Sequence, residues 1–172
     1  MRSNENFPYQ PSSPYSASKA SADHLVRSFY KTYKIPSITT HCSNNFGPYQ
    51  HEEKFIPKII KNALKWSKIP IYGEGKNIRD WIYVKDNVKA IMHIIKSRVR
   101  NECFNIGIKN YIKNIDVVMS VLNWFDKGED YIQYVDNRWG QDVRYSIDNK
   151  KILDLGWKPE HSKGIYKWHE DL

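Results

Sequence analysis

The stretch Ser12-Ser13-Pro14-Tyr15-Ser16-Ala17-Ser18-Lys19-Ala20 decides how the chain folds, because it marks the start of a long helix. A serine before a proline favours a helix start: its hydroxyl accepts a free amide of the first turn, and proline fits there without losing a hydrogen bond. Apolar residues then recur every three or four positions, at Ala22, Leu25, Val26, Phe29 and Tyr33. The spacing predicts a helix down to Tyr33 with one apolar stripe.

Tyr15 and Lys19 lie one helical turn apart, so the phenol and the ammonium can approach the same point in space. A free phenol titrates near pH ~10, and a neighbouring positive charge stabilises the phenolate. Tyr15 could therefore take or give a proton at neutral pH. The same spacing also occurs on ordinary solvated helix faces, and the pair alone does not decide between the two interpretations.

Three motifs together resemble one superfamily in order and spacing. They are Pro14 to Ala20, Cys42-Ser43-Asn44-Asn45-Phe46-Gly47-Pro48-Tyr49, and Ile78-Arg79-Asp80-Trp81-Ile82-Tyr83-Val84. The chain is similar to the extended short-chain dehydrogenase/reductases, most closely to the dTDP-glucose 4,6-dehydratases, from about Pro8 to Ile165. It contains no G-x-G-x-x-G turn, the family's cradle for the dinucleotide pyrophosphate. The resemblance therefore identifies it as a C-terminal portion that lacks the N-terminal dinucleotide-binding half.

This resemblance implies an NAD-dependent lyase that converts dTDP-glucose to dTDP-4-dehydro-6-deoxyglucose. It implies that Tyr15 and Lys19 are catalytic and also contact the cofactor, and that Asn45 is a further cofactor contact. The substrate contacts that it implies are Asn44, Lys54, Phe55, Pro70, Ile71, Tyr72, Arg79, Asn114 and Arg138. Trp139 and Gln141 stand where the family has proline and histidine, so a nucleotide contact at Gln141 is not implied.

Two of these residues have simpler interpretations from the sequence. The planar fork of Arg79 matches phosphate oxygens in pairs, yet an ion pair with Asp80 or Asp86 would also explain an arginine there. Asn114 has the position of a substrate ligand, and an N-cap of the following helix would explain it as well.

We expect an α/β fold: the C-terminal part of a Rossmann-like parallel sheet plus a smaller α/β substrate-binding lobe. Residues 1–50 would be the end of the NAD-binding domain with the Tyr-x-x-x-Lys helix, and residues 51–172 the sugar-nucleotide-binding lobe. Residues 43–48 are predicted to form a loop after a strand. Asp86 is predicted to cap a helix that buries Val88, Ile91, Met92 and Ile95 in the core.

The composition limits the classes of ligand that the chain is expected to bind. The net charge is +8, but the basic residues are spread along the chain, which favours a phosphorylated small molecule over nucleic acid. The six histidines show no zinc-binding spacing, so no metal is expected. Cys42 and Cys103 are predicted to be buried, reduced thiols, which fits the cytoplasm. No window approaches the ~20 apolar residues of a membrane span.

Other functions remain open at this stage. The chain could be a non-catalytic remnant, a sugar-nucleotide-binding module, or another nucleotide-sugar epimerase or dehydratase. The elimination step in the family needs an acid and a base from the N-terminal half, so we expect little turnover by this chain alone. The partners that the resemblance implies are a dTDP-sugar, a separate polypeptide that supplies the N-terminal half, and a second copy, since relatives form homodimers.

Overall fold

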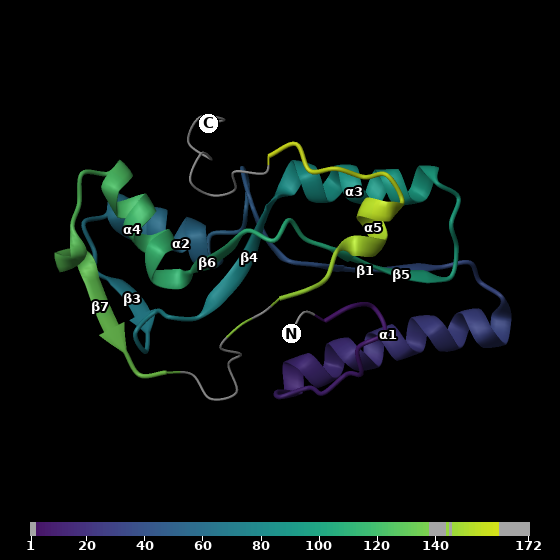
Figure 1. Cartoon of the computed structure of the whole chain (residues 1–172). Coiled ribbons are helices and arrows are strands. Elements are labelled where there is room, and N and C mark those ends of the chain that lie inside the picture. Colours follow the sequence, from purple (N-terminus) through teal and green to yellow (C-terminus); the bar gives the residue numbers. More distant parts are fainter. Residues whose placement is uncertain (1–2, 138–143, 145, 162–172) are drawn as a thin grey trace.

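The computed structural model describes residues 3–137, 144 and 146–161 of the chain. One part is built on two neighbouring parallel strands, β1 (Ile38–Cys42) and β5 (Glu102–Ile106). Helix α1 (Pro14–Tyr33) lies on one side of this pair, and α3 (Val84–Lys96) and α5 (Lys150–Asp154) lie on the other (Figure 1). These layers are the expected continuation of a parallel α/β sheet.

The other part contains two further groups of strands. β2 (Asn44–Phe46) pairs in parallel with β4 (Ile78–Tyr83), and β6 (Tyr111–Lys113) pairs with β4 in the antiparallel direction. β3 (Ile69–Tyr72) pairs in parallel with β7 (Ile132–Val135).

Two helices pack on these strands: α2 (Phe55–Leu64) and α4 (Asn114–Trp124), the latter followed by the 3-10 turn η1 (Glu129–Tyr131). The expected α/β class with parallel strands is confirmed. The division near residue 50 stays a prediction, and β5 pairs with β1 across it.

Helix α1 begins and ends where its local signals predict. Ser13 is the N-cap, and its Oγ accepts a hydrogen bond from the Ser16 amide at 3.1 Å, with Pro14 in the first turn. Lys34 ends the helix with a left-handed backbone, φ 59°. No residue of α1 is buried, and Leu25, Phe29 and Tyr33 are 59%, 50% and 66% exposed. The apolar stripe is present but is left uncovered.

Replacing Ser13 with alanine is expected to destabilise the chain by about 1 kcal/mol, because the Ser16 amide loses its acceptor. Ser21→Ala is the matched control within α1, since the Ser21 hydroxyl only donates to the Ala17 carbonyl. Thermal unfolding followed by far-UV circular dichroism measures both. Equal midpoints for the two variants would contradict the capping role.

Helix α3 differs from the prediction in its start and its buried face. It begins at Val84, so Asp86 is not its cap but a buried residue of its first turn. The Asp86 carboxylate accepts the backbone amides of Glu160 and His161 at 3.2 and 2.9 Å and contacts His161 Nδ1 at 3.0 Å. It ties the later chain to α3.

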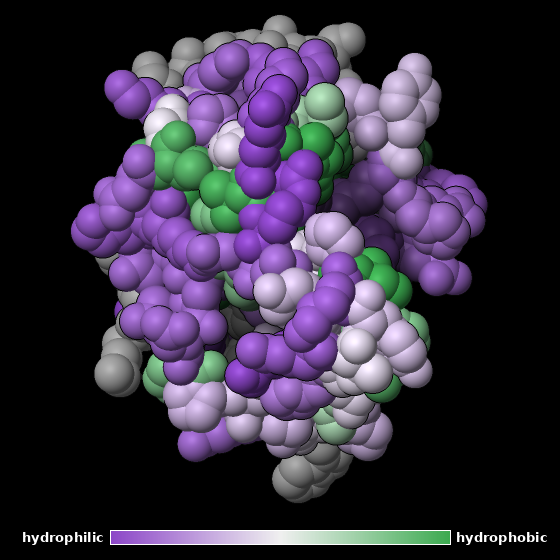
Figure 2. All heavy atoms as spheres, turned by 90° about the vertical axis from the view of Figure 1, so that its right-hand side faces the viewer, coloured by the Kyte–Doolittle hydropathy of each residue, from purple (hydrophilic) through white to green (hydrophobic). Residues whose placement is uncertain are grey.

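The core prediction for α3 was wrong for three residues, because Val88, Met92 and Ile95 are 52%, 46% and 49% exposed. The buried apolar residues of α3 are Ala90 and Ile94, which pack against β5 and α5, with the partly buried Ile91 beside them. Figure 2 views the molecule from the right-hand side of Figure 1 and shows hydrophobic side chains in separate patches among hydrophilic ones.

The two cysteines are not buried as predicted. Cys42 is exposed and Cys103 is partly buried. Both lie in strands of the β1–β5 pair, and in the described part of the chain neither of these strands pairs with a third strand. Strand propensity predicted their local conformation but not their exposure.

The first described residues are bound to residues more than a hundred positions later. Ser3 forms a bridge with Ile147: its amide donates to the Ser146 carbonyl at 3.1 Å, and its carbonyl accepts the Asp148 amide at 2.9 Å. The buried Asn105 donates from Nδ2 to the carbonyls of Ser3 and Asp148 at 3.0 and 3.1 Å. Together these bonds join the N-terminal segment to the end of β5. Within the described residues, no helix is long and apolar enough to cross a bilayer.

Candidate functional site

The first group of candidate residues lies at the start of α1. Tyr15 is 71% exposed, and Lys19 Nζ lies 5.8 Å from the centre of its ring. The helical spacing therefore does bring the ammonium to the phenol, on a face of α1 that is open to solvent. This arrangement suits proton transfer to or from a group that docks against the helix.

The two asparagines after β1 belong to a strand and not to the predicted loop. Asn44 and Asn45 start β2, opposite Trp81 and Ile82 of β4. Asn45 Nδ2 donates to Cys42 Sγ at 3.3 Å and to the Ser43 carbonyl at 3.1 Å. Its Oδ1 is buried and has no hydrogen-bond partner among the described residues. A buried acceptor without a donor is costly, so this oxygen suits a ligand that brings an N–H.

Lys54 and Phe55 lie where α2 begins. Lys54 is exposed in the N-cap position. The Phe55 ring stacks on that of Trp81 with centres 6.0 Å apart and an angle of 20° between planes. Phe55 is therefore partly used in packing, while the Lys54 ammonium remains at the surface.

Three more of the predicted residues, Tyr72, Arg79 and Asn114, lie near one another around the turn between β3 and β4. The Asn114 amide donates to the Asn77 carbonyl at 2.9 Å, and the next amide, of Ile115, donates to the Gly75 carbonyl at 3.0 Å. The Gly75 amide in turn reaches the Tyr72 carbonyl at 3.2 Å. These bonds place the end of β3, the start of α4 and the strand that carries Arg79 at one location.

Within this group, the side chains differ in what they could contact. Ile71 is 2% exposed and belongs to the core, so any contact from it would come from its backbone. Pro70 and Tyr72 are partly buried on the other face of β3. Arg79 donates from Nη1 to the Ile78 carbonyl at 2.8 Å. Asn114 is the first residue of α4, whose N-cap is Lys113, so the N-cap interpretation of Asn114 was wrong. Arg138, Trp139 and Gln141 lie outside the described residues.

The carboxylates proposed as simpler partners for Arg79 have other roles. Asp80 is 1% exposed, and its two oxygens accept the backbone amides of Ile108 and Asn110 at 3.2 and 2.7 Å. Burial raises the pKa of the Asp80 carboxyl, and the amides only partly offset this. Asp86 holds Glu160 and His161. Both carboxylates therefore stabilise loops.

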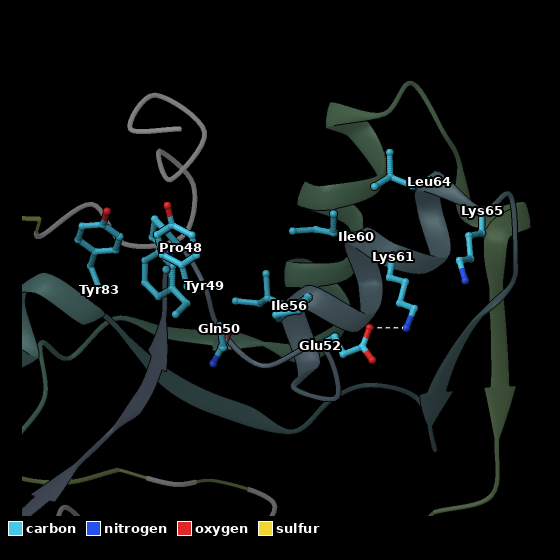
Figure 3. A pocket seen from close by; sticks show the side chains of 13 residues that line it. Pro48, Tyr49, Gln50, Glu52, Ile56, Ile60, Lys61, Leu64, Lys65 and Tyr83 are labelled. Carbon is cyan, nitrogen blue, oxygen red and sulfur yellow. Dashed lines mark hydrogen bonds and ion pairs between the residues drawn. The ribbon is translucent and has the colours of Figure 1, made fainter.

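A pocket of about 490 Å³ lies beside α2 and was not predicted. Ile56 and Ile60 point from α2 toward Pro48 and Tyr49, with Tyr83 beyond them (Figure 3). None of the predicted site residues that the structure describes lines it. The signal was present in the sequence, because α2 has more apolar residues than one face needs: Ile59 and Ala63 are buried, whereas Leu64 is 62% exposed.

Comparisons with known proteins agree with the resemblance seen in the sequence. The family model described as GDP-mannose 4,6 dehydratase matches residues 1–164. A dTDP-glucose 4,6-dehydratase of Escherichia coli is 48% identical over 170 residues, covering 92% of this chain and 47% of that protein. One of Salmonella typhimurium is 50% identical over 163 residues, covering 90% and 45%.

Solved structures show the same similarity. The chain matches a dTDP-glucose 4,6-dehydratase of Bacillus anthracis in complex with NAD, with a TM-score of 0.89, 40% identity, and coverage of 99% of this chain and 56% of that one. It matches the enzyme DesIV of Streptomyces venezuelae, with NAD and TYD bound, with a TM-score of 0.91, 33% identity, and coverage of 99% and 55%.

The chain spans about half the length of the curated relatives that it matches. Its α/β fold with parallel strands is the Rossmann-like fold of the matched enzymes. The similarity to dTDP-glucose 4,6-dehydratases predicted from the three motifs is thus confirmed. Because the family model extends over residues 1–164, the chain belongs to the GDP-mannose 4,6 dehydratase family.

Proposed function

We propose that the chain is the substrate-binding portion of an NAD-dependent dTDP-glucose 4,6-dehydratase, a lyase that forms dTDP-4-dehydro-6-deoxyglucose. The observation that carries the proposal is the Tyr15–Lys19 pair on the open face of α1, 5.8 Å from ammonium to ring centre, in a chain of this family. The matched relatives from two bacteria are dTDP-glucose 4,6-dehydratases, which supports this substrate over other nucleotide sugars.

The residues present fit one part of the cofactor. The buried Oδ1 of Asn45, which has no partner in the described part of the chain, is an acceptor for a carboxamide N–H such as that of nicotinamide. Tyr15 and Lys19 would hold the adjoining ribose. When bound, the cofactor would supply reversible hydride transfer for the sugar.

As part of this proposal, we assign a role to each of the chain's own candidate residues. Tyr15 as phenolate takes the proton of the sugar C4 hydroxyl, and Lys19 keeps the phenolate charged. Lys54, Arg79 and Arg138 hold the diphosphate, while Asn44, Phe55, Asn114 and the β3 residues Pro70, Ile71 and Tyr72 surround the nucleotide sugar. Binding energy from the diphosphate, remote from C4, orients the sugar against the catalytic pair.

We further propose that a separate N-terminal polypeptide completes the enzyme and supplies the acid and base of the elimination. Its absence would explain why no residue of α1 is buried and why Val88, Met92 and Ile95 are exposed on α3. Residues 1–50 would then be the end of the NAD-binding domain, and residues 51–172 would form the sugar-nucleotide-binding lobe. The complete enzyme would be cytoplasmic and would form homodimers.

Calorimetric titration tests the binding part of this proposal. The purified chain is titrated with dTDP-glucose, then with NAD, and again after a candidate N-terminal polypeptide is added. We expect dTDP-glucose to bind the chain, and Arg79→Ala to weaken binding by roughly tenfold or more, since one charge-assisted contact contributes about 1.5 to 3 kcal/mol.

Arg100→Ala is the matched control, because Arg100 is exposed and its Nη1 donates to the Val99 carbonyl. We expect this variant to bind dTDP-glucose as the parent chain does. Equal affinities for the Arg79 and Arg100 variants would contradict a diphosphate contact at Arg79. If neither ligand binds with or without the added polypeptide, the chain is a non-catalytic remnant.

A further inference from the structure

Away from the candidate site, Tyr9, Asp23, His41 and Cys103 form one connected cluster between α1 and the β1–β5 pair. Cys103 Sγ lies 3.4 Å from His41 Nδ1, and His41 Nε2 lies 2.6 Å from Asp23 Oδ2. The Tyr9 hydroxyl donates to the same Asp23 oxygen at 2.7 Å. The cluster therefore contains a nucleophilic sulfur, an imidazole and a carboxylate in series.

The strand register explains why the thiol and the imidazole meet. Thr39 lies opposite Cys103 and His41 opposite Asn105, so positions 39, 41 and 103 project from the same face of the two strands. Asp23 reaches this face from α1 and Tyr9 from the segment that precedes it. Four parts of the chain thus contribute to one small polar group.

The cluster is a linear series of hydrogen-bonded groups and does not have the geometry of a metal site. The thiol and the carboxylate contact opposite nitrogens of the His41 ring, so the possible ligands do not converge on a common point. In the described residues, no group of three His, Cys, Asp or Glu side chains is arranged to hold a metal ion. A nucleophile next to a base that a third group orients is the arrangement that activates a cysteine.

The electrostatics agree with this geometry. The hydrogen bond with Cys103, and after it that with Asp23, raise the pKa of His41 to about 9 although burial opposes the shift. At neutral pH the ring is then protonated on both nitrogens and can donate to both partners. A cationic imidazole next to a thiol favours the thiolate, the form that reacts. On the other side of β5, Lys151 donates to the Cys103 carbonyl at 2.7 Å and pairs with Glu102 at 2.5 Å.

We propose that Cys103 is a reactive thiol and that this cluster is a site of covalent modification by small disulfides. The Cys103 sulfur attacks one sulfur of the disulfide, a new S–S bond forms, and the old one breaks. The other half leaves as a thiolate with the bonding electron pair, and the proton of Cys103 stays on His41. The site is accessible to small reagents, because the side chains of His41 and Asp23 are 26% and 24% exposed and Cys103 is only partly buried.

The chain contains its own reference thiol. Cys42 is more exposed than Cys103, but its sulfur accepts a hydrogen bond from Asn45 Nδ2 at 3.3 Å and contacts no imidazole of the described residues. Exposure alone would make Cys42 the faster thiol, whereas activation by His41 would make Cys103 faster at low pH. The two interpretations therefore predict opposite orders of reactivity.

The test uses dithiobis(nitrobenzoate) on the Cys42→Ser chain, in which only Cys103 can react, and on the Cys103→Ser chain, in which only Cys42 can. The released nitrobenzoate thiolate is followed by absorbance between pH 6 and 8. When the pH is lowered from 8 to 6, the reaction of an unassisted thiol slows by nearly 100-fold, because its thiolate fraction falls. We expect the Cys103 rate to change by less than about threefold and to exceed the Cys42 rate at pH 6.

His41→Gln in the Cys42→Ser chain should slow Cys103 at pH 6 by tenfold or more and restore the steep pH profile. Asp23→Asn, which leaves the imidazole in place, should give a smaller loss. If the His41 variant fails to fold by circular dichroism, the pH profile of the Cys42→Ser chain decides by itself. A steep profile there, or a Cys103 rate unaffected by His41→Gln, would overturn the proposal and leave the cluster as a tie between α1 and the sheet. The result does not depend on binding of any sugar nucleotide.

Discussion

If the proposed function holds, Tyr15→Phe is expected to reduce conversion of dTDP-glucose by roughly 10²- to 10⁴-fold in the complex of this chain with the proposed N-terminal polypeptide. The substitution removes only the hydroxyl that exchanges a proton with the sugar, and general acid–base catalysis contributes a factor of this size. Because Tyr15 is 71% exposed, the stability of the chain should not change. Turnover is measured by the absorbance, in alkali, of the 4-keto sugar that the proposed reaction forms, and binding by calorimetry.

Tyr33→Phe provides the matched control, since Tyr33 lies at the other end of α1 and is 66% exposed. This variant should keep full activity. The expected pattern for Tyr15→Phe is a loss of kcat with little change in dTDP-glucose affinity. A variant that keeps more than half of the parent kcat would show that another group moves the proton.

Asp80→Ala is expected to lower the free energy of unfolding of the chain by about 3 kcal/mol. The substitution leaves the amides of Ile108 and Asn110 without the buried carboxylate that they now share. Loss of hydrogen bonds to a charged group costs about 1.5 to 3 kcal/mol each when the remaining partner stays buried. For a chain of this length the melting temperature should fall by roughly 10 °C.

Asp154→Ala is the control, because it removes an exposed carboxylate and not a buried one. Asp154 is 61% exposed and pairs with Lys150 one turn earlier in α5, a contact worth less than about 0.5 kcal/mol. Its melting temperature should stay within about 1 °C of the parent. Equal losses for Asp80→Ala and Asp154→Ala would contradict the anchoring role of Asp80.

Gly107 offers an independent check of the Asp80 geometry. A methyl group at Gly107 would lie 2.4 Å from Asp80 Oδ2, so Gly107→Ala forces the carboxylate out of its position. Once the carboxylate is gone, the shortest remaining contacts of this methyl group are with Ile147 side-chain carbons at 3.2 and 3.3 Å, which a small shift of Ile147 would relieve. The double variant should therefore lose clearly less stability than the sum of the two single losses.

The sequence predicted those features whose causes are local. Ser13 and Pro14 specify the start of α1 through hydrogen bonds and backbone angles within one turn, and the structure confirms them. The Tyr15–Lys19 approach also needs only helical geometry. The motifs identified the family because they combine three such local patterns in order.

Features that depend on distant partners were not predictable in this way. Asn44 and Asn45 are typical of turns, but β4 offers a parallel neighbour and they form β2 instead. The apolar stripes of α1 and α3 have the period of buried helices, yet a period does not say whether a partner surface is present. The meeting of Arg79, Asn114 and Tyr72 depends on backbone bonds around Gly75 and Asn77.

The bonds between Ser3 and residues 105 and 146–148 determine when the N-terminal segment can become ordered. As the chain is synthesised, α1 can form as soon as it leaves the ribosome, because its cap and its turns are local. Ser3 must wait until about 100 more residues have been added for its bond from Asn105, and until about 145 more have been added for its backbone bonds with Ser146 and Asp148. During translation, the first described residues of this chain are therefore among the last to be fixed in place.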